Sequence, residues 1–177
     1  NNDRYEYIFP YYKYNTNLIG DLVNKSINFT STGENILNNT NTLKSSIIND
    51  LSYNSQEYYS LNGLKSIFRI NTKNLNSVGK NSSEYKSSPQ IEIMSEISLD
   101  SSYPLLKQTE SNINYLTPKV LLKINPSDMK NYSNSDKTIN INNIFSKNRL
   151  GISDTLETGK SITLGLDYKK ENIDDLN

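Results

Sequence analysis

Residues 91–99 read IEIMSEISL. Apolar side chains occupy the odd positions of this segment except Ser95, and polar side chains occupy the even positions except Met94. Successive side chains of a β-strand point to opposite faces of the sheet. The alternation therefore predicts a strand with one apolar face and one polar face.

The same alternation recurs along most of the chain. It is clearest in residues 162–168, where Ile, Leu, Leu and Tyr alternate with Thr, Gly and Asp, and in residues 43–53. We therefore predict an all-β fold in which antiparallel up-and-down strands form a curved sheet of about seven to eight strands. The predicted strands are residues 4–14, 24–31, 43–53, 57–70, 90–100, 112–125 and 160–170.

The composition excludes several other classes of protein. Asn (28) and Ser (24) are abundant among the 177 residues, whereas Ala, Cys, His and Trp are absent. Helical bundles rely on Ala, and a chain without Cys or His has no disulfide, zinc finger, thiol nucleophile or His-based triad. Lys plus Arg equals Asp plus Glu at 19 each, so no net positive charge attracts nucleic acid.

The lengths of the predicted strands and links point to a membrane barrel. Several strands reach the ~9–11 residues that a tilted strand needs to cross a bilayer. The links hold about 9, 11, 3, 19, 11 and 34 residues, so that each odd-numbered link is shorter than the next. Short turns at one end and long loops at the other are typical of outer-membrane barrels, here with long polar loops near residues 71–89 and 126–159. A soluble β-sandwich has the same alternation and stays open as an alternative.

No group of residues forms a recognisable catalytic or cofactor site. Residues 158–161 (TGKS) contain the end of a phosphate-binding loop, but Asp154 stands where that motif needs Gly, and a strand follows instead of a helix. Glu92 and Glu96 lie on the polar face of one strand, where we expect them to face solvent or a lumen. We predict that the chain is not an enzyme and binds no cofactor, metal or nucleic acid.

Several segments resemble one known family. Residues 103–105 (YPL) and 116–120 (LTPKV) resemble a Tyr/Phe-Pro-Leu stretch followed by Leu-x-Pro-x-Val in the central part of LptD, the LPS-assembly or organic solvent tolerance protein family. Residues 142–151 (NNIFSKNRLG) resemble that family's Asn-Leu-Phe…Asn-Arg-Phe stretch, and residues 152–160 (ISDTLETGK) the Asp-Arg-x-Glu-x-Gly run that follows it. Residues 164–168 (LGLDY) resemble the strand that closes this region.

The resemblance, which at residues 73–82 is to the alphaproteobacterial branch, implies a function without chemistry. The family's outer-membrane β-barrel receives lipopolysaccharide from the periplasmic transport bridge and inserts it into the outer leaflet. Its implied partners are lipopolysaccharide, membrane lipid, the lipoprotein LptE as a plug, and the bridge, which docks on an N-terminal jellyroll. The chain starts at Asn1 without Met and resembles only the middle of the barrel, so we expect the jellyroll and the first and last strands to lie outside it.

The resemblance also marks structural positions in a luminal loop and in the wall. We expect the loop near 126–159 to pack into the barrel mouth or onto the plug, because it is long and yet carries apolar residues such as Ile144 and Leu150. The runner-up is a secreted or surface-attached β-structural protein of the adhesin type, and an outer-membrane lipase or polysaccharide-cleaving enzyme is a third possibility. The marked positions are Pro104, Pro118, Asn143, Phe145, Asn148, Arg149, Gly151, Asp154, Glu157 and Gly159.

Overall fold

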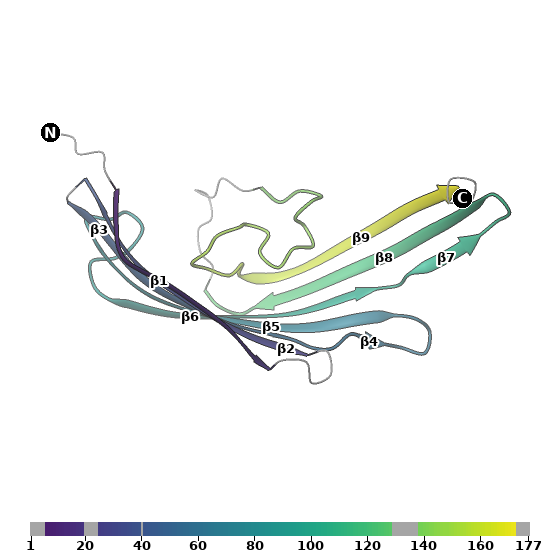
Figure 1. Cartoon of the computed structure of the whole chain (residues 1–177), viewed down its shortest axis with the longest axis horizontal. Helices are drawn as coiled ribbons and strands as arrows, with labels where there is room; N and C mark the ends of the chain where they lie inside the picture. The colour runs from purple at the N-terminus through teal and green to yellow at the C-terminus, as the bar shows by residue number, and fades with distance from the viewer. Residues whose placement is uncertain (1–5, 20–24, 40, 129–137, 173–177) are drawn as a thin grey trace.

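The predicted all-β class is confirmed by the structure, a computed structural model that describes residues 6–19, 25–39, 41–128 and 138–172. One open antiparallel sheet of nine strands accounts for all the regular structure among these residues (Figure 1). Residues 4 and 5, the start of the expected strand 4–14, lie outside the described residues. The strands are β1 (Glu6–Ile19), β2 (Ser26–Asn38), β3 (Thr42–Asn54), β4 (Tyr58–Tyr59), β5 (Lys65–Lys80), β6 (Gln90–Ser102), β7 (Leu105–Gln108), β8 (Asn112–Asn125) and β9 (Gly159–Asn172).

The nine strands form seven rows that follow one another in chain order. β4 pairs with β5 just beyond the residues that β3 pairs with, so β4 continues the row of β3. In the same way β7 pairs with the first half of β8 and β6 with its second half, so β7 continues the row of β6. The rows run β1, β2, β3–β4, β5, β6–β7, β8 and β9, which agrees with the expected seven to eight strands.

Two marked prolines lie at the break between β6 and β7. Pro104 follows the last residue pair of β6, and Tyr103 still donates its backbone N–H to the carbonyl oxygen of Pro118 on β8 at 3.0 Å. In an antiparallel sheet, the N–H and C=O of one residue point toward the same neighbouring strand. The carbonyl of Pro118 points toward the break between β6 and β7, so the N–H that proline lacks would have pointed there too. Proline is tolerated in a sheet at such interruptions.

Two of the expected boundaries are wrong. The expected strand 57–70 is a hairpin, because the chain turns at Asn62-Gly63, where Gly63 has a φ of 85°. Asn-Gly is a strong hairpin signal, and the apolar alternation on either side hid it. The first half of the expected loop 71–89 belongs to β5, which leaves only residues 81–89 as the connection to β6.

The expected alternation, in which each odd-numbered link is shorter than the next, is found in two of its three pairs. The links between the rows contain 6, 3, 5, 9, 3 and 33 residues, counted from the strand bounds. Only the last link, 126–158, is long, and its residues 129–137 lie outside the described part of the chain. At one end of the sheet the links therefore contain 3 to 6 residues, and at the other end 3, 9 and 33. The pair of links on either side of β2 reverses the expected order.

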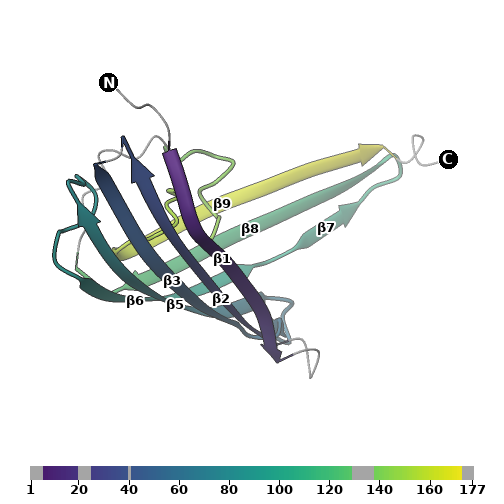
Figure 2. The ribbon, with the colours of Figure 1, turned by 60° about the vertical axis from the view of Figure 1, so that its left-hand side comes forward.

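The sheet is strongly curved, and residues 138–158 lie on its concave side, which we call the inner face (Figures 1 and 2). Among the described residues, only three hydrophobic side chains are buried, whereas twelve polar or charged ones are. Rows of large apolar side chains lie on the opposite, outer face, where Ile91 is 75% exposed and Leu164 is also 75% exposed. The usual distribution of a soluble protein is therefore inverted. The buried hydrophobic residues are Leu75, Met94 and Leu121.

A row of polar side chains crosses the outer face of the first strands. The hydroxyl of Ser31 donates to Asn49 Oδ1 at 2.7 Å, and the Asn49 amide donates to Asn74 Oδ1 at 3.0 Å. The Tyr12 and Ser31 hydroxyls lie 3.2 Å apart. Each of these polar groups has a partner, so the row is internally satisfied. Within the described residues, no helix is long and apolar enough to cross a membrane.

Candidate functional site

Residues 138–158, which we call the inner loop, are shaped by their own asparagine side chains. Asn143 donates its side-chain amide to the carbonyl oxygens of Thr138 at 2.9 Å and Arg149 at 3.2 Å, and so joins the two ends of the first turn. Asn148 accepts the backbone N–H of Gly151 at 2.8 Å and donates to the carbonyl of Ile152 at 2.8 Å. Gly151 has a φ of 65°, which favours glycine in this second turn.

Arg149 attaches the inner loop to β9. Its Nε donates to Glu157 Oε2 at 2.8 Å, one Nη pairs with the other carboxylate oxygen, and the guanidinium also donates to the hydroxyls of Ser161 (3.1 Å) and Thr163 (3.2 Å). The Arg149 side chain is only 6% exposed. A bidentate, charge-assisted pair with further hydrogen bonds is the arrangement in which a buried charge is well compensated.

Glu157 is held in turn by the start of β9 and the end of β8. Asn125 donates its side-chain amide to the carbonyl oxygen of Glu157 at 3.0 Å. Two residues later Gly159 has a φ of 93°, and no atom lies within 4 Å of the position of a Cβ there. The conformation of the backbone, and not lack of space, therefore favours glycine at the point where the loop becomes β9.

Lys123 on β8 attaches the middle of the loop to the wall. Its Nζ donates to the carbonyl oxygens of Ser146 at 3.2 Å and Lys147 at 2.8 Å. Glu96 on β6 lies 3.6 Å from the same ammonium and also accepts the side-chain amide of Asn71 at 3.2 Å. Both charged side chains are at most 5% exposed, so this pair lies under the loop.

Lys73 on β5 forms a third attachment. Its Nζ lies 2.6 Å from the carboxylate of Asp50 and donates to the carbonyl oxygen of Ser153 at 2.7 Å. Nearby, the hydroxyl of Thr155 lies 3.2 Å from the sulfur of Met94. Cationic groups of two strands thus bind backbone carbonyls of the loop that have no partner in a regular element.

Phe145 packs on a glycine of β9. A Cβ at Gly165 would lie 2.6 Å from two atoms of the Phe145 ring, which is closer than side chains approach one another. Gly165 is therefore required for the ring to lie against the strand at this position.

The inner loop also meets the connection between β5 and β6. Burial raises the pKa of Tyr85, and the negative charges of Asp154 and Glu84 raise it further, whereas a hydrogen bond with Ser46 acts in the opposite direction. The phenol is therefore neutral over the physiological range. Asp154, one of the marked positions, acts here through the effect of its negative charge on the pKa of Tyr85.

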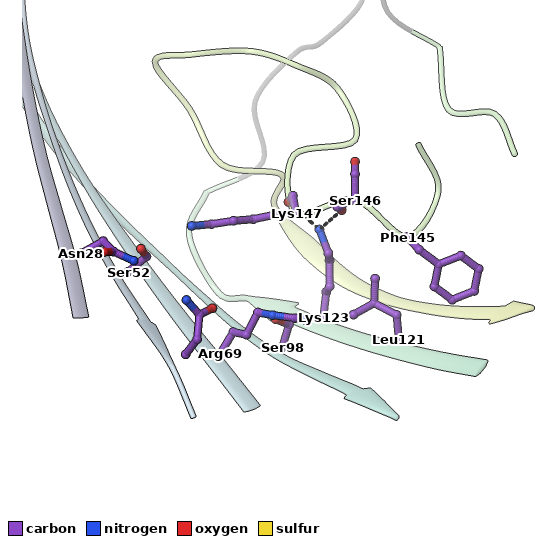
Figure 3. Close-up of a pocket in the computed structure, with 10 residues that line it drawn as sticks. Asn28, Ser52, Arg69, Ser98, Leu121, Lys123, Phe145, Ser146 and Lys147 are labelled. Atoms are coloured by element: carbon purple, nitrogen blue, oxygen red, sulfur yellow. Dashed lines mark hydrogen bonds between the residues drawn. The ribbon is translucent and has the colours of Figure 1, made fainter. Parts of the chain in front are cut away.

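Polar cavities remain between the inner loop and the wall. One cavity of 290 Å³ is lined by residues of β2, β3, β5, β6 and β8 and by loop residues 145–147 (Figure 3). Second and third cavities of 260 Å³ and 220 Å³ share residues with the first, Lys147 and Phe145 respectively. The inner loop thus lies on the wall without filling the concave side.

The structure brings together most of the marked positions. Eight of the ten lie in the inner loop or at its junction with β9, and Arg149 and Glu157 form its central ion pair. Pro104 and Pro118 lie apart, in the wall. Glu96 was expected on the polar face of its strand, but the sequence did not single out the wall residues that bind the loop. Their positions along the strands would have placed them on one face. These residues are Lys73, Lys123, Asn125, Ser161 and Thr163.

The geometry of the site is that of an attachment between the inner loop and the wall. The pairs Lys73–Asp50, Lys123–Glu96 and Arg149–Glu157 are engaged with one another, and the two lysines also with carbonyl oxygens of the loop. Glu96 was expected to face solvent or a lumen. Its carboxylate lies under the loop and does not face open solvent. In the described part of the chain, no group of three or more acidic side chains could hold a metal ion.

No protein-family model, curated protein or solved structure matches this chain.

Proposed function

We propose that this chain forms part of the wall of an outer-membrane β-barrel of the LptD type, which inserts lipopolysaccharide into the outer leaflet of the outer membrane without chemistry. In this proposal the outer face contacts lipid and the inner face lines a wet lumen. The inner loop lies inside that lumen. LptE and the periplasmic bridge are the proposed protein partners of the complete protein.

The observation that carries the proposal is the inverted distribution of side chains. A curved sheet buries Lys, Glu, Arg, Asn and Ser on its concave side and exposes rows of Ile and Leu on its convex side. Contiguous exposed apolar surface of this kind marks contact with a membrane or another protein. A hydrocarbon environment stabilises an apolar outer row, and a lumen tolerates polar side chains.

The lengths of the strands and the two open edges also support the proposal. Seven of the nine strands contain 13 to 16 residues, more than the ~9–11 needed to cross a bilayer. β1 and β9 each pair with one neighbour, and the long edges of a sheet are a liability unless they are paired. Further strands beyond β1 and β9 would remove both edges in a closed barrel.

Site-directed spin labelling of the complete protein in lipid vesicles tests the proposal. This chain has no cysteine, so single cysteines can be introduced at Ile93 and Leu164 on the outer face and at Ser52 on the inner face. We expect labels at Ile93 and Leu164 to be accessible to oxygen and protected from a water-soluble nickel complex, and the label at Ser52 to behave in the opposite way. Equal access of the nickel complex to all three would contradict a lipid-facing wall.

The adhesin-type alternative predicts a different behaviour. A second protein layer would then cover the outer rows, and the complete protein would be soluble and monodisperse without detergent. Within the described residues there is one sheet, and the outer rows are uncovered. Solubility of the complete protein without detergent would favour this alternative.

A further inference from the structure

The largest group of cations near the inner loop surrounds the 290 Å³ cavity. Arg69 comes from β5, Lys123 from β8 and Lys147 from the loop, and all three line it. Figure 3 shows Lys147 reaching from the loop toward Asn28 and Ser52 on the opposite side of the cavity. Three elements far apart in the sequence therefore direct positive charge toward one space.

Two of these cations are compensated and the third is not. Arg69 donates from both Nη atoms to Asp100 Oδ2 at 3.2 Å, and Lys123 is paired with Glu96. The ammonium of Lys147 has no hydrogen-bond or ion-pair partner among the described residues. Lys147 is exposed and lines the cavity. With Lys73 and its partner Asp50, which also act on Lys147, the described residues place four positive and three negative groups here, a net charge of +1.

The ammonium of Lys147 experiences charges of both signs, and the carboxylates affect its pKa more strongly than the cations do. Loss of solvation lowers its pKa, and the neighbouring cations Lys73 and Arg69 lower it further. The carboxylates of Asp50 and Glu96 act in the opposite direction. An anion placed beside Lys147 would stabilise its charged form and relieve the repulsion from the other cations.

The remaining lining of the cavity is suited to hydroxyl groups. Asn28, Ser52, Asn54 and Ser98 offer amides and hydroxyls, which both donate and accept hydrogen bonds. Leu121 and the Phe145 ring form the apolar part of the lining. The volume of 290 Å³ is at the lower end for ligand sites, which limits the occupant to a small group such as one sugar unit.

We propose that this cavity binds a sugar unit that carries a phosphate or carboxylate group, with Lys147 and Arg69 holding the anion and Asn28 and Ser52 contacting the hydroxyls. Such a ligand would bridge the inner loop and strands β2 and β3. The inference depends only on the inner face and not on what covers the outer face.

Calorimetric titration of the complete protein in detergent micelles tests the site with three probes: glucosamine 1-phosphate, glucuronate and glucosamine. We expect one or both acidic sugars to bind and glucosamine to bind at least tenfold more weakly. Lys147→Met should weaken binding of the acidic sugars at least tenfold. Lys170→Met, at the exposed far end of β9, is the matched control and should leave binding unchanged.

Hydrogen exchange provides a second readout that does not depend on the affinity of the variants. Bound acidic sugar should slow exchange in residues 143–149 and in the facing parts of β2 and β3 of the wild-type protein. No binding by the wild-type protein, equal binding of glucosamine, or equal binding by the Lys147→Met variant would each overturn the proposal. Equal displacement by inorganic phosphate at the same concentration would replace the sugar site by a simple phosphate site and overturn it as stated.

These outcomes are separable from those for the membrane wall. Acidic-sugar binding by a protein whose outer face is water-accessible would support the site and reject the wall. A lipid-facing wall without acidic-sugar binding would reject the site alone.

Discussion

Arg149 illustrates how single residues attach the inner loop. Its guanidinium makes four hydrogen bonds to three side chains, and two of these bonds go to one carboxylate. The planar fork of arginine matches a carboxylate in a way that a lysine ammonium does not. Because the Arg149 side chain is 6% exposed and the Glu157 side chain 20% exposed, removal of one partner leaves the other charge largely buried without compensation.

Arg149→Met should therefore release the inner loop. We expect about 3–5 kcal/mol of local destabilisation from the uncompensated Glu157. Hydrogen exchange of the complete protein in micelles should show faster exchange in residues 143–157 with little change in β5 and β6. The double variant Arg149→Met with Glu157→Leu should recover part of the protection, since no buried charge remains. Unchanged exchange in the single variant would contradict a role for the ion pair in attaching the loop.

The raised pKa of Tyr85 predicts that the folded protein loses stability at alkaline pH. Its pKa is raised in the folded protein above the value of 10.0 of an ordinary tyrosine. Above about pH 10 the unfolded chain releases this proton while the folded chain retains it, so the stability falls as the pH rises, by at most about 1.4 kcal/mol per pH unit. Below pH 10 both states are protonated and the residue contributes no pH dependence.

Denaturant unfolding of the wild-type protein and of Tyr85→Phe between pH 9 and 11.5 measures this contribution. The variant should lose less stability over that range, because phenylalanine has no proton to release. Parallel curves for the two proteins would show that Tyr85 has the same pKa in the folded and unfolded states.

At the scale of elements, β9 has different requirements on its two faces. Its outer positions carry Ile162, Leu164, Leu166 and Tyr168, which are 63% to 75% exposed. Its inner positions accommodate the loop, and Gly165 provides the surface on which the Phe145 ring lies. On β9 the inner positions therefore pack against the loop, and the outer side chains form an exposed apolar row.

Gly165→Val should disturb this packing. The added side chain would occupy the place of the Phe145 ring, and overpacking of this kind costs about 1–3 kcal/mol. Chemical denaturation should show the loss, and Phe145→Ala in the same chain should relieve much of it. Leu164→Val, one residue away on the outer face, is the control and should have a smaller effect. Equal stability of Gly165→Val and wild type would contradict the contact.

β5 explains why the expected loop 71–89 was partly wrong. Residues 71–80 are rich in Asn, Lys and Ser, which is typical of loops, and only every second residue of this segment is buried. Its backbone is nevertheless paired with β3 on one side and β6 on the other. When both faces of a strand are polar, hydrophobic alternation disappears, and strand formation depends on neighbours that a local pattern does not contain.

At the scale of the whole molecule, the inverted faces are the property that connects the fold with the proposed function. Exposed apolar rows and a buried polar network occur on opposite sides of the same sheet. In water such a sheet would leave its outer rows uncovered and its edges open. In a bilayer the same rows would be stabilised, and the polar network would remain on the side of the lumen.

Arginine substitutions along the outer row test this property by depth. Leu164→Arg should destabilise the protein folded in lipid vesicles by about 2–4 kcal/mol, if this position lies near the bilayer midplane. Tyr168→Arg, four residues nearer the end of the strand, should cost only about 0–1 kcal/mol, because it lies near the interface. Reversible unfolding in vesicles measures both values. Small and equal effects at the two positions would contradict a lipid-facing row.

The alternation of side chains along each strand was sufficient to predict the all-β class and the two faces of the sheet, because strand periodicity is a local property of the chain. The motif around Asn143, Arg149 and Glu157 likewise marked the residues that shape the inner loop. Only the tertiary structure showed that Lys73, Lys123 and Glu96 hold this loop, since these residues lie on different strands and converge only through the register of the sheet. Which charged residues become buried depends on that register, and no single segment of the sequence contains it.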